Sequence, residues 1–368
     1  MDHREQPNRP EWAPKTAGRE FASTVVPGSA ASPGAATGDY RRRRGLLPVE
    51  AYVEGIRRRD RTLLARAITL VESNAPAHEA TAQAVLQELL PETGRAVRVG
   101  ITGTPGAGKS TLIEALGGQL VEAGKRVAVL AVDPSSSVTR GSILGDKTRM
   151  ERLARDPRAF IRPSPSSGTL GGVGRKSRET MLLCEAFGFD VILLETVGVG
   201  QSEVTVRSMT DFFFLIAIAG AGDELQGIKK GVVELADLIA VNKADGDNVR
   251  RARMAKAEYT RVLSFLAPAT EGWKTKAMTV SALTREGIGD LWKRIEDFCA
   301  TTQESGVWER RRQAQNVQWF RAMLEEGILA RFLAQPEMKA RLATLERAVA
   351  EGSQPVTAAV REILGQTP

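Results

Sequence analysis

Apolar residues in the central part of the chain gather in short continuous runs, each bounded by glycine or polar residues. Such runs are typical of strands buried on both faces of a parallel sheet, because a strand with one wet face alternates apolar and polar residues. Stretches with helical spacing separate most of the runs, so the pattern predicts an α/β fold with helices on both faces of the sheet. The predicted strands are Val97–Ile101, Arg126–Val132, Val191–Leu194, Asp211–Ala219, Leu238–Val241 and Ala277–Val280.

Helical patterns flank this region on both sides. Apolar residues between Leu63 and Val71 recur at helical spacing behind Asp60, whose carboxylate can cap the helix, and a second helix is predicted over 79–90. The later part of the chain has three helical patterns with too few apolar faces to form a core of their own, so we interpret them as an arm used in oligomerisation. The helices predicted after Gly287 are 287–298, 308–332, 336–351 and 356–364.

Composition sets the first part of the chain apart from the rest. Residues 1–46 are rich in Pro, Gly, Ala, Ser and Thr and contain few large apolar residues, which predicts a disordered tail. We therefore predict four parts: this tail, an N-terminal helical region over 47–94, an α/β domain over 95–302 and a C-terminal helical dimerisation arm over 303–368.

The chain is basic, with a net charge of +7 and a pI near 9.6, which by itself would suit a nucleic-acid partner. Part of the excess lies in two arginine clusters, Arg41–Arg44 and Arg57–Arg59, and aromatic residues that could stack on bases make up only 5%. We therefore expect no nucleic-acid partner. The longest apolar run, Phe212–Ala219, is far shorter than the roughly 20 residues of a membrane-spanning helix, so we expect no membrane partner either.

Cysteine and histidine usage excludes several kinds of chemistry. The only cysteines, Cys184 and Cys299, are too few for a disulfide framework or a four-ligand zinc site, and they indicate reduced thiols and a cytoplasmic location. The N-terminus lacks the apolar core of a secretory signal. The two histidines, His3 and His78, lie outside every motif described below, so we expect no histidine-based catalysis or metal binding.

The sequence GTPGAGKS follows the first predicted strand and opens a helix. This spacing is that of a P-loop, in which glycines allow backbone N–H groups to surround phosphates. Lys109 would place a positive charge at the outer phosphates, and the Ser110 hydroxyl would ligate Mg²⁺. The predicted phosphate-binding residues are Gly103, Pro105, Gly106, Ala107, Gly108, Lys109, Ser110 and Thr111.

The sequence NKAD, residues 242–245, follows the fifth predicted strand and is suited to reading guanine. The Asp245 carboxylate can accept hydrogen bonds from the N1–H and the exocyclic amine of guanine, whereas adenine offers neither donor, so this carboxylate would reject adenine strongly. Asn242 can bond the other edge of the base and tie loops together, and the stem of Lys243 can cover the ring. The segment Ser281-Ala282-Leu283, after the next strand, would complete the base pocket.

Carboxylates follow other predicted strands, opposite the P-loop. Asp133 ends the second strand and Glu195 ends the third, while Asp146 lies in the stretch between them. Magnesium bound to a nucleotide takes oxygen ligands, often through water. We therefore predict that Asp133, Asp146 and Glu195, together with Ser110, serve a Mg²⁺ ion.

The segment from Glu195 to Gly198 lies where a loop that reaches the γ-phosphate is expected, with the Gly198 N–H as the contact. We predict Lys109, Glu195 and Gly198 as the catalytic residues. In Ras-like GTPases a glutamine directly follows this glycine and orients the attacking water. Here Val199 follows, and the nearest glutamine is Gln201, which predicts slow hydrolysis that a partner accelerates.

Two glycine-rich polar segments, 164–174 and 220–231, interrupt the α/β pattern. Long loops inside a compact domain usually serve a function, so we interpret both as responsive to nucleotide or facing a partner, with plain surface linkers as the alternative.

Several segments together resemble the MeaB/ArgK family of P-loop GTPases, which are associated with methylmalonyl-CoA mutase. The resemblance runs from about residue 47 to about residue 335, and the most specific strings are ETVGVGQSE and GAGDELQGIKKG. The segments that carry it are VDPSS (132–136), GGVGRKSRETM (171–181), ETVGVGQSE (195–203), GAGDELQGIKKG (220–231) and NKAD (242–245).

The resemblance implies a fold of the SIMIBI branch of GTPases, a homodimer with N- and C-terminal helical extensions, and GTP or GDP with Mg²⁺ as cofactors. It also implies a chaperone of an adenosylcobalamin-dependent acyl-CoA mutase, above all methylmalonyl-CoA mutase, which gates cofactor loading and protects or reactivates the mutase. The roles given above to the P-loop, the carboxylates and NKAD agree with it. A loop implied to signal nucleotide state to the mutase contains Asp223, Glu224, Gln226, Lys229 and Lys230. Residues 1–46 have no counterpart in this resemblance.

Two other functions remain as alternatives. A nickel-type metal-insertion GTPase of the same branch would carry Cys or His near its switch regions, but this chain has only Cys184 and Cys299, and both its histidines precede the P-loop. A small-molecule kinase, an older interpretation of the family, would need an acceptor site, and none is evident in the sequence.

Overall fold

The computed structural model describes residues 45–132, 150–163, 170–196, 202–219 and 230–365. The chain divides into two compact units, residues 1–46 and residues 47–368, and almost all of the first lies outside the described residues. The fold below is therefore that of the second unit. Within the part of the chain that is described, no helix is both long enough and apolar enough to cross a membrane.

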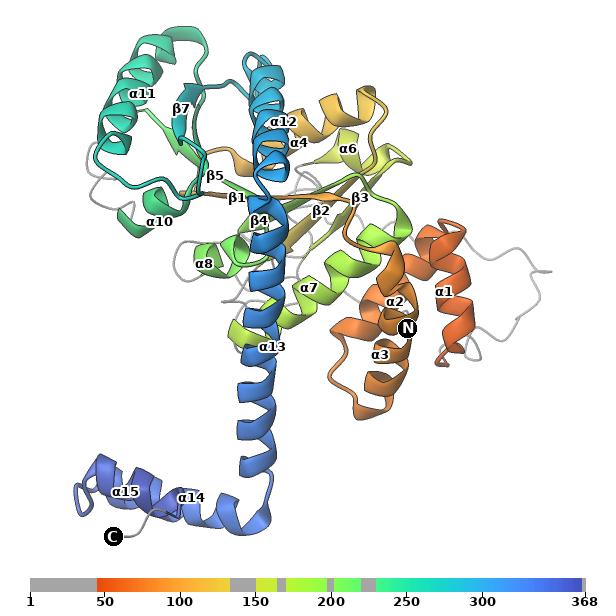
Figure 1. The fold of residues 1–368 in the computed structure, drawn as a ribbon, viewed down its shortest axis with the longest axis vertical. Helices are drawn as coiled ribbons and strands as arrows, with labels where there is room; N and C mark the ends of the chain where they lie inside the picture. Colours follow the sequence, from red (N-terminus) through yellow and green to blue (C-terminus); the bar gives the residue numbers. More distant parts are fainter. Residues whose placement is uncertain (1–44, 133–149, 164–169, 197–201, 220–229, 366–368) are drawn as a thin grey trace, which may run out of the picture. The chain divides into compact units, whose positions relative to one another are not determined.

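Seven parallel strands form one sheet in the order β3-β2-β4-β1-β5-β6-β7 (Figure 1). The parallel sheet and all six predicted strands are confirmed. The additional strand, β3, escaped prediction because its four residues, AFIR, include only a short apolar run before an arginine. The strands are β1 (Val97–Gly103), β2 (Val127–Val132), β3 (Ala159–Arg162), β4 (Val191–Thr196), β5 (Phe212–Ile218), β6 (Leu238–Asn242) and β7 (Lys276–Thr279).

Both faces of the sheet are buried, which explains the continuous apolar runs. In β2, Val127 and Val129 belong to one hydrophobic core, whereas Ala128 and Leu130 belong to another. Successive side chains of a strand point to opposite faces, so a strand covered on both sides needs an apolar residue at every position.

Helices supply the covering layers. One core is shared with α1 (Val49–Arg57), α2 (Arg61–Glu72), α3 (Pro76–Leu89), α7 (Leu170–Phe187) and the residues at the end of α8 (Ser202–Arg207). The other is shared with α4 (Lys109–Glu122), α6 (Glu151–Arg155) and α12 (Ile288–Glu304). A third cluster joins β5 and β6 to α10 (Lys230–Leu235) and α11 (Val249–Leu263). Two 3₁₀ turns, Leu90–Glu92 and Gly246–Asn248, lie between these elements.

The N-terminal helices begin where the sequence indicates. The Asp60 carboxylate accepts hydrogen bonds from the backbone N–H groups of Thr62, at 2.7 Å, and Leu63, at 3.2 Å, which confirms the predicted cap of α2. The buried residues of α1 to α3 belong to the same core as α7 and one face of the sheet. These helices are therefore a covering layer of the α/β fold, with no separate core.

The C-terminal helices α13 (Val307–Leu333), α14 (Pro336–Ala350) and α15 (Val356–Ile363) also lie where they were predicted. The first half of α13 contacts α12 and α7, and its only buried residues are Val307, Trp308 and Gln315. From Val317 onward, α13 exposes large apolar side chains at helical spacing. They are Val317, Phe320, Leu324, Ile328 and Leu329, each at least half exposed.

The candidate site lies at the carboxyl ends of the strands, where ligands bind in open α/β sheets. β1 leads into the P-loop, β4 ends beside Glu195, and β6 and β7 lead to NKAD and to Ser281. At the end of β1 a side chain would collide with the neighbouring strand, because a Cβ on Gly103 would lie 2.5 Å from the carbonyl oxygen of Ile216. Glycine is therefore required where the chain leaves the sheet for the loop.

Candidate functional site

The P-loop joins β1 to α4 and holds the lysine ammonium over its own backbone. Lys109 Nζ donates hydrogen bonds to the carbonyl oxygens of Gly103, at 2.7 Å, and Thr104, at 3.3 Å. Gly108 has a φ of 86°, and a Cβ there would lie 2.7 Å from Asn242 Nδ2, so both conformation and space demand glycine. The loop thus places one cation beside the N-terminus of α4, an arrangement suited to a phosphate chain.

The ammonium of Lys109 lies in a partly desolvated, acidic environment. Burial lowers the pKa of Lys109, while the carboxylates of Glu195 and Glu203 act in the opposite direction. Glu203, near the start of α8, is itself only 3% exposed. A half-buried cation in such an environment is well placed to shift toward phosphate oxygens, because phosphate compensates its desolvation more strongly.

Ser110, at the start of α4, contacts Glu195, near the end of β4. The Ser110 hydroxyl donates a hydrogen bond to Glu195 Oε1 at 3.1 Å, and both residues are buried, at 9% and 5% exposure. Glu195 pairs with Ile101 in β1 and with Ala131 in β2, so the register of three strands fixes its position. The pair supplies two hard oxygen donors beside the P-loop, the ligand type that Mg²⁺ prefers.

Asn242 connects the P-loop to the base side of the site. Its Nδ2 donates to the carbonyl oxygen of Ala107 at 2.8 Å, and its Oδ1 accepts from the backbone N–H of Ala282 at 3.1 Å. The residue is 1% exposed, so both bonds are shielded from water. Asn242 therefore ties loops together, as predicted, because the nitrogen and the oxygen of its side-chain amide both form hydrogen bonds within the protein.

Asp245 lies half-buried at the edge of the base side, and Ser281 orients it. The Ser281 hydroxyl donates to Asp245 Oδ2 and accepts from the backbone N–H of Thr284 at 3.0 Å. Lys243 adopts a left-handed φ of 60°, and Asn248 Nδ2 donates to its carbonyl oxygen at 2.8 Å. A left-handed lysine held by a neighbouring side chain keeps the turn tight, so NKAD and the 281–283 segment converge.

The 281–283 segment contributes exposed surface as well as backbone. Ala282 is partly buried, whereas Leu283 is 79% exposed. The remaining predicted P-loop residues also differ in exposure. Ala107 is fully buried, while Pro105, Gly106 and Thr111 are exposed.

Several predicted site residues lie outside the described residues: Asp133, Asp146, Gly198, Asp223, Glu224, Gln226 and Lys229. Lys230 is described only as the first residue of α10. The structure thus brings together Lys109, Ser110 and Glu195 on the phosphate side, and Asn242, Asp245 and Ser281 on the base side. The chemical roles predicted for all of these residues stay predictions.

Two features of the site escaped sequence reasoning. Thr196 Oγ1 donates to Thr102 Oγ1 at 2.9 Å, and both residues are almost completely buried between β1 and β4. The pairing depends on β1 and β4 being neighbours, which no local pattern reveals. Glu203 lies in the ETVGVGQSE string, but only its burial and its charge interaction with Lys109 single it out from surface glutamates.

Three features define a P-loop nucleotide-binding protein. They are a buried strand that runs into a glycine-rich loop, a lysine at the start of the next helix, and an Asn-Lys-x-Asp turn at a later strand. A family model described as "Methylmalonyl Co-A mutase-associated GTPase MeaB" matches residues 64–337. The chain therefore belongs to the MeaB/ArgK family of P-loop GTPases, and it hydrolyses GTP.

Similar proteins agree with this assignment. A probable GTPase of Mycobacterium tuberculosis is 51% identical over 316 residues, which cover 86% of this chain and 94% of that protein. The mitochondrial methylmalonic aciduria type A homolog of Mus musculus is 44% identical over 315 residues, covering 83% of this chain and 76% of the relative. The solved structure of a LAO/AO transport system kinase matches with a TM-score of 0.70 and 39% identity, and it covers 87% of this chain and 99% of that one.

Proposed function

We propose that this GTPase is a chaperone of an adenosylcobalamin-dependent acyl-CoA mutase, most directly methylmalonyl-CoA mutase. In this role it gates loading of the cobalamin cofactor and protects or reactivates the mutase. The observation that carries the proposal is the match to a family described as methylmalonyl-CoA mutase-associated over residues 64–337. The mouse relative, named for methylmalonic aciduria, supports the same role.

The phosphate side of the site supports the proposed roles of the P-loop residues. Lys109 binds the outer phosphates, and backbone N–H groups of the loop surround the phosphate chain. The donor set of Ser110 and Glu195 fits Mg²⁺, because both are oxygen ligands and the ion usually keeps several waters and few carboxylates. Bound there, the ion would neutralise charge on the phosphates. Asp133 and Asp146, its other proposed ligands, lie outside the described residues.

The base side supports guanine as the nucleobase. Ser281 holds one oxygen of the Asp245 carboxylate, which leaves the carboxylate with acceptor capacity for the base. In this proposal the carboxylate accepts from the N1–H and the amine of guanine, Lys243 covers the ring, and the backbone around Ala282 and Leu283 closes the pocket.

Hydrolysis adds water to the γ-phosphate and releases GDP and inorganic phosphate. Lys109 stabilises charge on the oxygens that bridge the leaving group, and Glu195 holds the phosphate side in register with the P-loop. We propose that Gly198 contacts the γ-phosphate through its N–H. Since Val199 stands where Ras-like GTPases have the glutamine that orients water, intrinsic turnover is slow and a partner accelerates it.

The C-terminal helices support a homodimer. The exposed apolar side chains of α13 recur at positions three and four residues apart, including Phe320, Leu324 and Ile328, and α15 exposes Val356 and Val360 in the same way. Residues at such spacing share one helix face, and a contiguous apolar face of this kind marks an interaction surface. We propose that a second copy of the chain covers it.

The thiols support a reducing compartment, which we propose is the cytoplasm, and argue against metal delivery. Cys184 in α7 and Cys299 in α12 are free. Burial raises the pKa of both thiols, for Cys299 to about 12. Metal is bound by thiolate rather than thiol, so neither residue is suited to carrying a nickel ion.

The test is phosphate release from GTP with increasing amounts of the cobalamin mutase encoded in the same genome. We expect the mutase to accelerate hydrolysis by the wild-type chain, and Lys109→Ala to release no phosphate at any mutase concentration. The Lys109→Ala reactions also control for contaminating phosphatase, because a phosphatase in the mutase preparation would release phosphate with either chain. If no cobalamin mutase from that genome changes the rate, the chaperone role is wrong, although the GTPase assignment stands.

A further inference from the structure

Helix α11 concentrates exposed cations on a single element. Five of its residues are basic and only Glu258 is acidic, and all five basic side chains are exposed. Among the described residues, no carboxylate lies within 4.0 Å of any of these five cations, whereas Arg57, Arg158 and Arg285 on other surfaces each have such a partner. The five are Arg250, Arg251, Arg253, Lys256 and Arg261.

The cations continue into an apolar surface at the end of the helix. Arg250, Met254 and Arg261 recur at helical spacing on one face, and this face leads to Phe265, directly after the helix. Met254 is 58% exposed and Phe265 is 83% exposed. An exposed phenylalanine beside a cluster of cations is the composition of a protein-binding surface, in which charged residues surround an apolar anchor.

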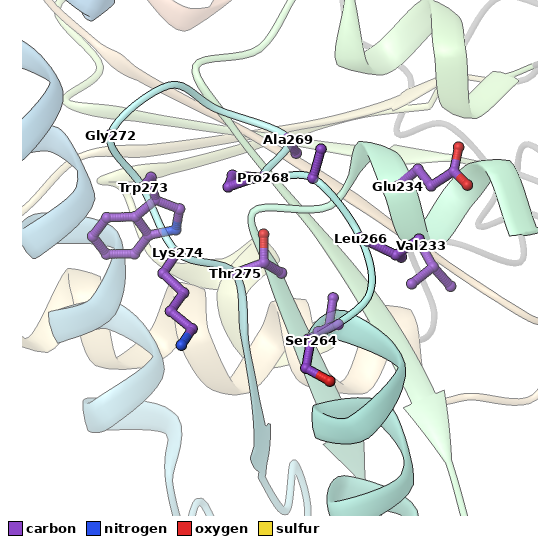
Figure 2. A pocket seen from close by; sticks show the side chains of 12 residues that line it. Val233, Glu234, Ser264, Leu266, Pro268, Ala269, Gly272, Trp273, Lys274 and Thr275 are labelled. Atoms are coloured by element: carbon purple, nitrogen blue, oxygen red, sulfur yellow. The ribbon is translucent and has the colours of Figure 1, made fainter.

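A cavity of about 390 Å³ opens beside this surface (Figure 2). Its walls come from the end of α11, the 264–275 segment that follows it, and α10, and they are mainly apolar. Lining side chains include Val233, Leu263, Leu266, Pro268 and Trp273. This volume is sufficient for one large apolar side chain of a partner.

The floor of the cavity is rigid. Trp273 Nε1 donates to the carbonyl oxygen of Asp237 at 2.9 Å, and Thr275 Oγ1 donates to that of Ala236 at 2.9 Å. Arg294 lies over the Trp273 ring, 4.6 Å from its centroid. A cavity whose floor is fixed in this way needs little ordering when a ligand enters.

The cavity is also connected along the chain to two segments that the sequence analysis associates with the bound nucleotide. The 220–229 segment leads directly into α10, which forms one wall. The 197–201 segment leads into α8, whose last residue, Arg207, pairs with the fully buried Asp237 at 2.9 Å. Asp237 in turn accepts a hydrogen bond from Thr270, in the loop that surrounds the cavity.

We propose that the α11 face and the adjoining cavity form the docking surface for an acidic segment of the partner mutase. An apolar side chain of that segment enters the cavity, and its carboxylates face the α11 cations. The inference rests on the proposed chaperone function and names its surface. A protein segment is favoured over nucleic acid because a phosphodiester backbone offers charge but no apolar side chain for the cavity. The links to α8 and α10 make docking sensitive to the bound nucleotide, since each nucleotide state would favour one arrangement of the walls.

The experiment measures binding of the cognate mutase to the full chain by surface-based kinetics, with GDP or a non-hydrolysable GTP analogue, at low and high salt. Arg253→Glu with Arg261→Glu reverses two of the five α11 cations. Arg95→Glu with Lys293→Glu, two exposed cations elsewhere, is the matched control for net charge. We expect the first double variant to bind roughly ten-fold or more weakly, mainly through slower association at low salt, and the control to bind like the wild type.

Phe265→Ala tests the apolar part of the surface. Leu90→Ala is its control, because Leu90 is an exposed apolar side chain in another part of the molecule, with 50% of its surface accessible. We expect Phe265→Ala to weaken binding roughly ten-fold at both salt concentrations, through faster dissociation. Basal GTP hydrolysis without mutase should be the same in all four variants, which also shows that they fold.

The outcomes separate this inference from the function on which it rests. If the mutase stimulates and binds the wild-type chain, and both test variants behave like their controls, the docking surface is wrong and the chaperone function stands. If the wild-type chain neither binds the mutase nor responds to it, both are wrong. If duplex DNA or transfer RNA binds the wild-type chain and the α11 variant loses that binding while it retains the mutase, the face is a nucleic-acid site and the inference is overturned.

Discussion

Guanine selectivity can be tested through one carboxylate. Asp245→Asn replaces a group with two acceptor oxygens by an amide with one acceptor and one donor group. Guanine presents two donors to this residue. The amide oxygen can accept a hydrogen bond from one of them, but the amide N–H group faces the other donor and repels it. Xanthine has a carbonyl oxygen where guanine has its amine, so the same amide can accept from N1–H and donate to that oxygen. The preference for the base should therefore change from guanine to xanthine.

The size of the change follows from the number of bonds at stake. A hydrogen bond to a charged group is worth about 1.5–3 kcal/mol, so two are worth about 3–6 kcal/mol. That difference corresponds to a loss of roughly 10²- to 10⁴-fold in GDP affinity. Ser281→Ala is the matched comparison, because it removes the hydroxyl that donates to Asp245 Oδ2 and leaves the carboxylate in place. It should weaken GDP roughly ten-fold without favouring xanthine.

Calorimetric titration with GDP, XDP and ADP measures these affinities directly. The wild-type chain should bind GDP far more tightly than ADP, and Asp245→Asn should bind XDP more tightly than GDP. Asp245 is half-buried and outside the hydrophobic cores, so thermal unfolding of the variant without nucleotide should match the wild type. Equal GDP and ADP affinities in the wild type, or an unchanged GDP affinity in Asp245→Asn, would refute the assignment of this carboxylate to the base.

Three further predictions concern other parts of the molecule. Lys109→Ala should abolish phosphate release while the melting temperature without nucleotide stays the same, because the hydrogen bonds of the ammonium to described residues go to carbonyl groups of its own loop. Unchanged turnover would remove Lys109 from the mechanism. Neither Cys184 nor Cys299 should react with a disulfide reagent at pH 8 until the chain is unfolded. Because the pKa of Cys299 is about 12, only about one Cys299 thiol in 10⁴ is ionised at pH 8. Rapid labelling of the folded protein would contradict this prediction. Leu324→Asp with Ile328→Asp should convert a dimer to monomers in sedimentation, since each apolar side chain contributes about 1.5–3 kcal/mol when buried; an unaffected dimer would place the interface elsewhere.

Much of the fold could be predicted because its signals are local. Continuous apolar runs mark strands buried on both faces, and helical spacing marks the covering helices, so six strands and the three C-terminal helices were correctly predicted. β3 has only four residues, and its place at the edge of the sheet depends on pairing with β2. No property of residues 159–162 alone indicates that pairing, so a local reading of the sequence could not find it.

The candidate site divides in the same way between local and non-local information. The P-loop and NKAD are contiguous motifs, and the sequence locates them without knowledge of strand order. The bond from Asn242 to the carbonyl oxygen of Ala107 and the pair of Thr102 with Thr196 join residues 135 and 94 positions apart. Such contacts arise only once β4, β1, β5 and β6 lie side by side, which is a property of topology.

The same topology separates two tasks at opposite ends of the sheet. The nucleotide motifs lie at the carboxyl ends of the strands, whereas α13 is anchored at the amino ends, where Arg312 forms a two-pronged ion pair with Asp211, just before β5. Gln315, also in α13, donates to the carbonyl oxygen of Thr210 at 2.9 Å. Helix α8 begins after the segment at the end of β4 and is followed directly by these anchoring residues. Helix α8 connects the two ends of the sheet, and its Arg207 forms an ion pair with Asp237 beside the cavity. A displacement of α8 would therefore change contacts both at the α13 anchor and at the proposed docking surface.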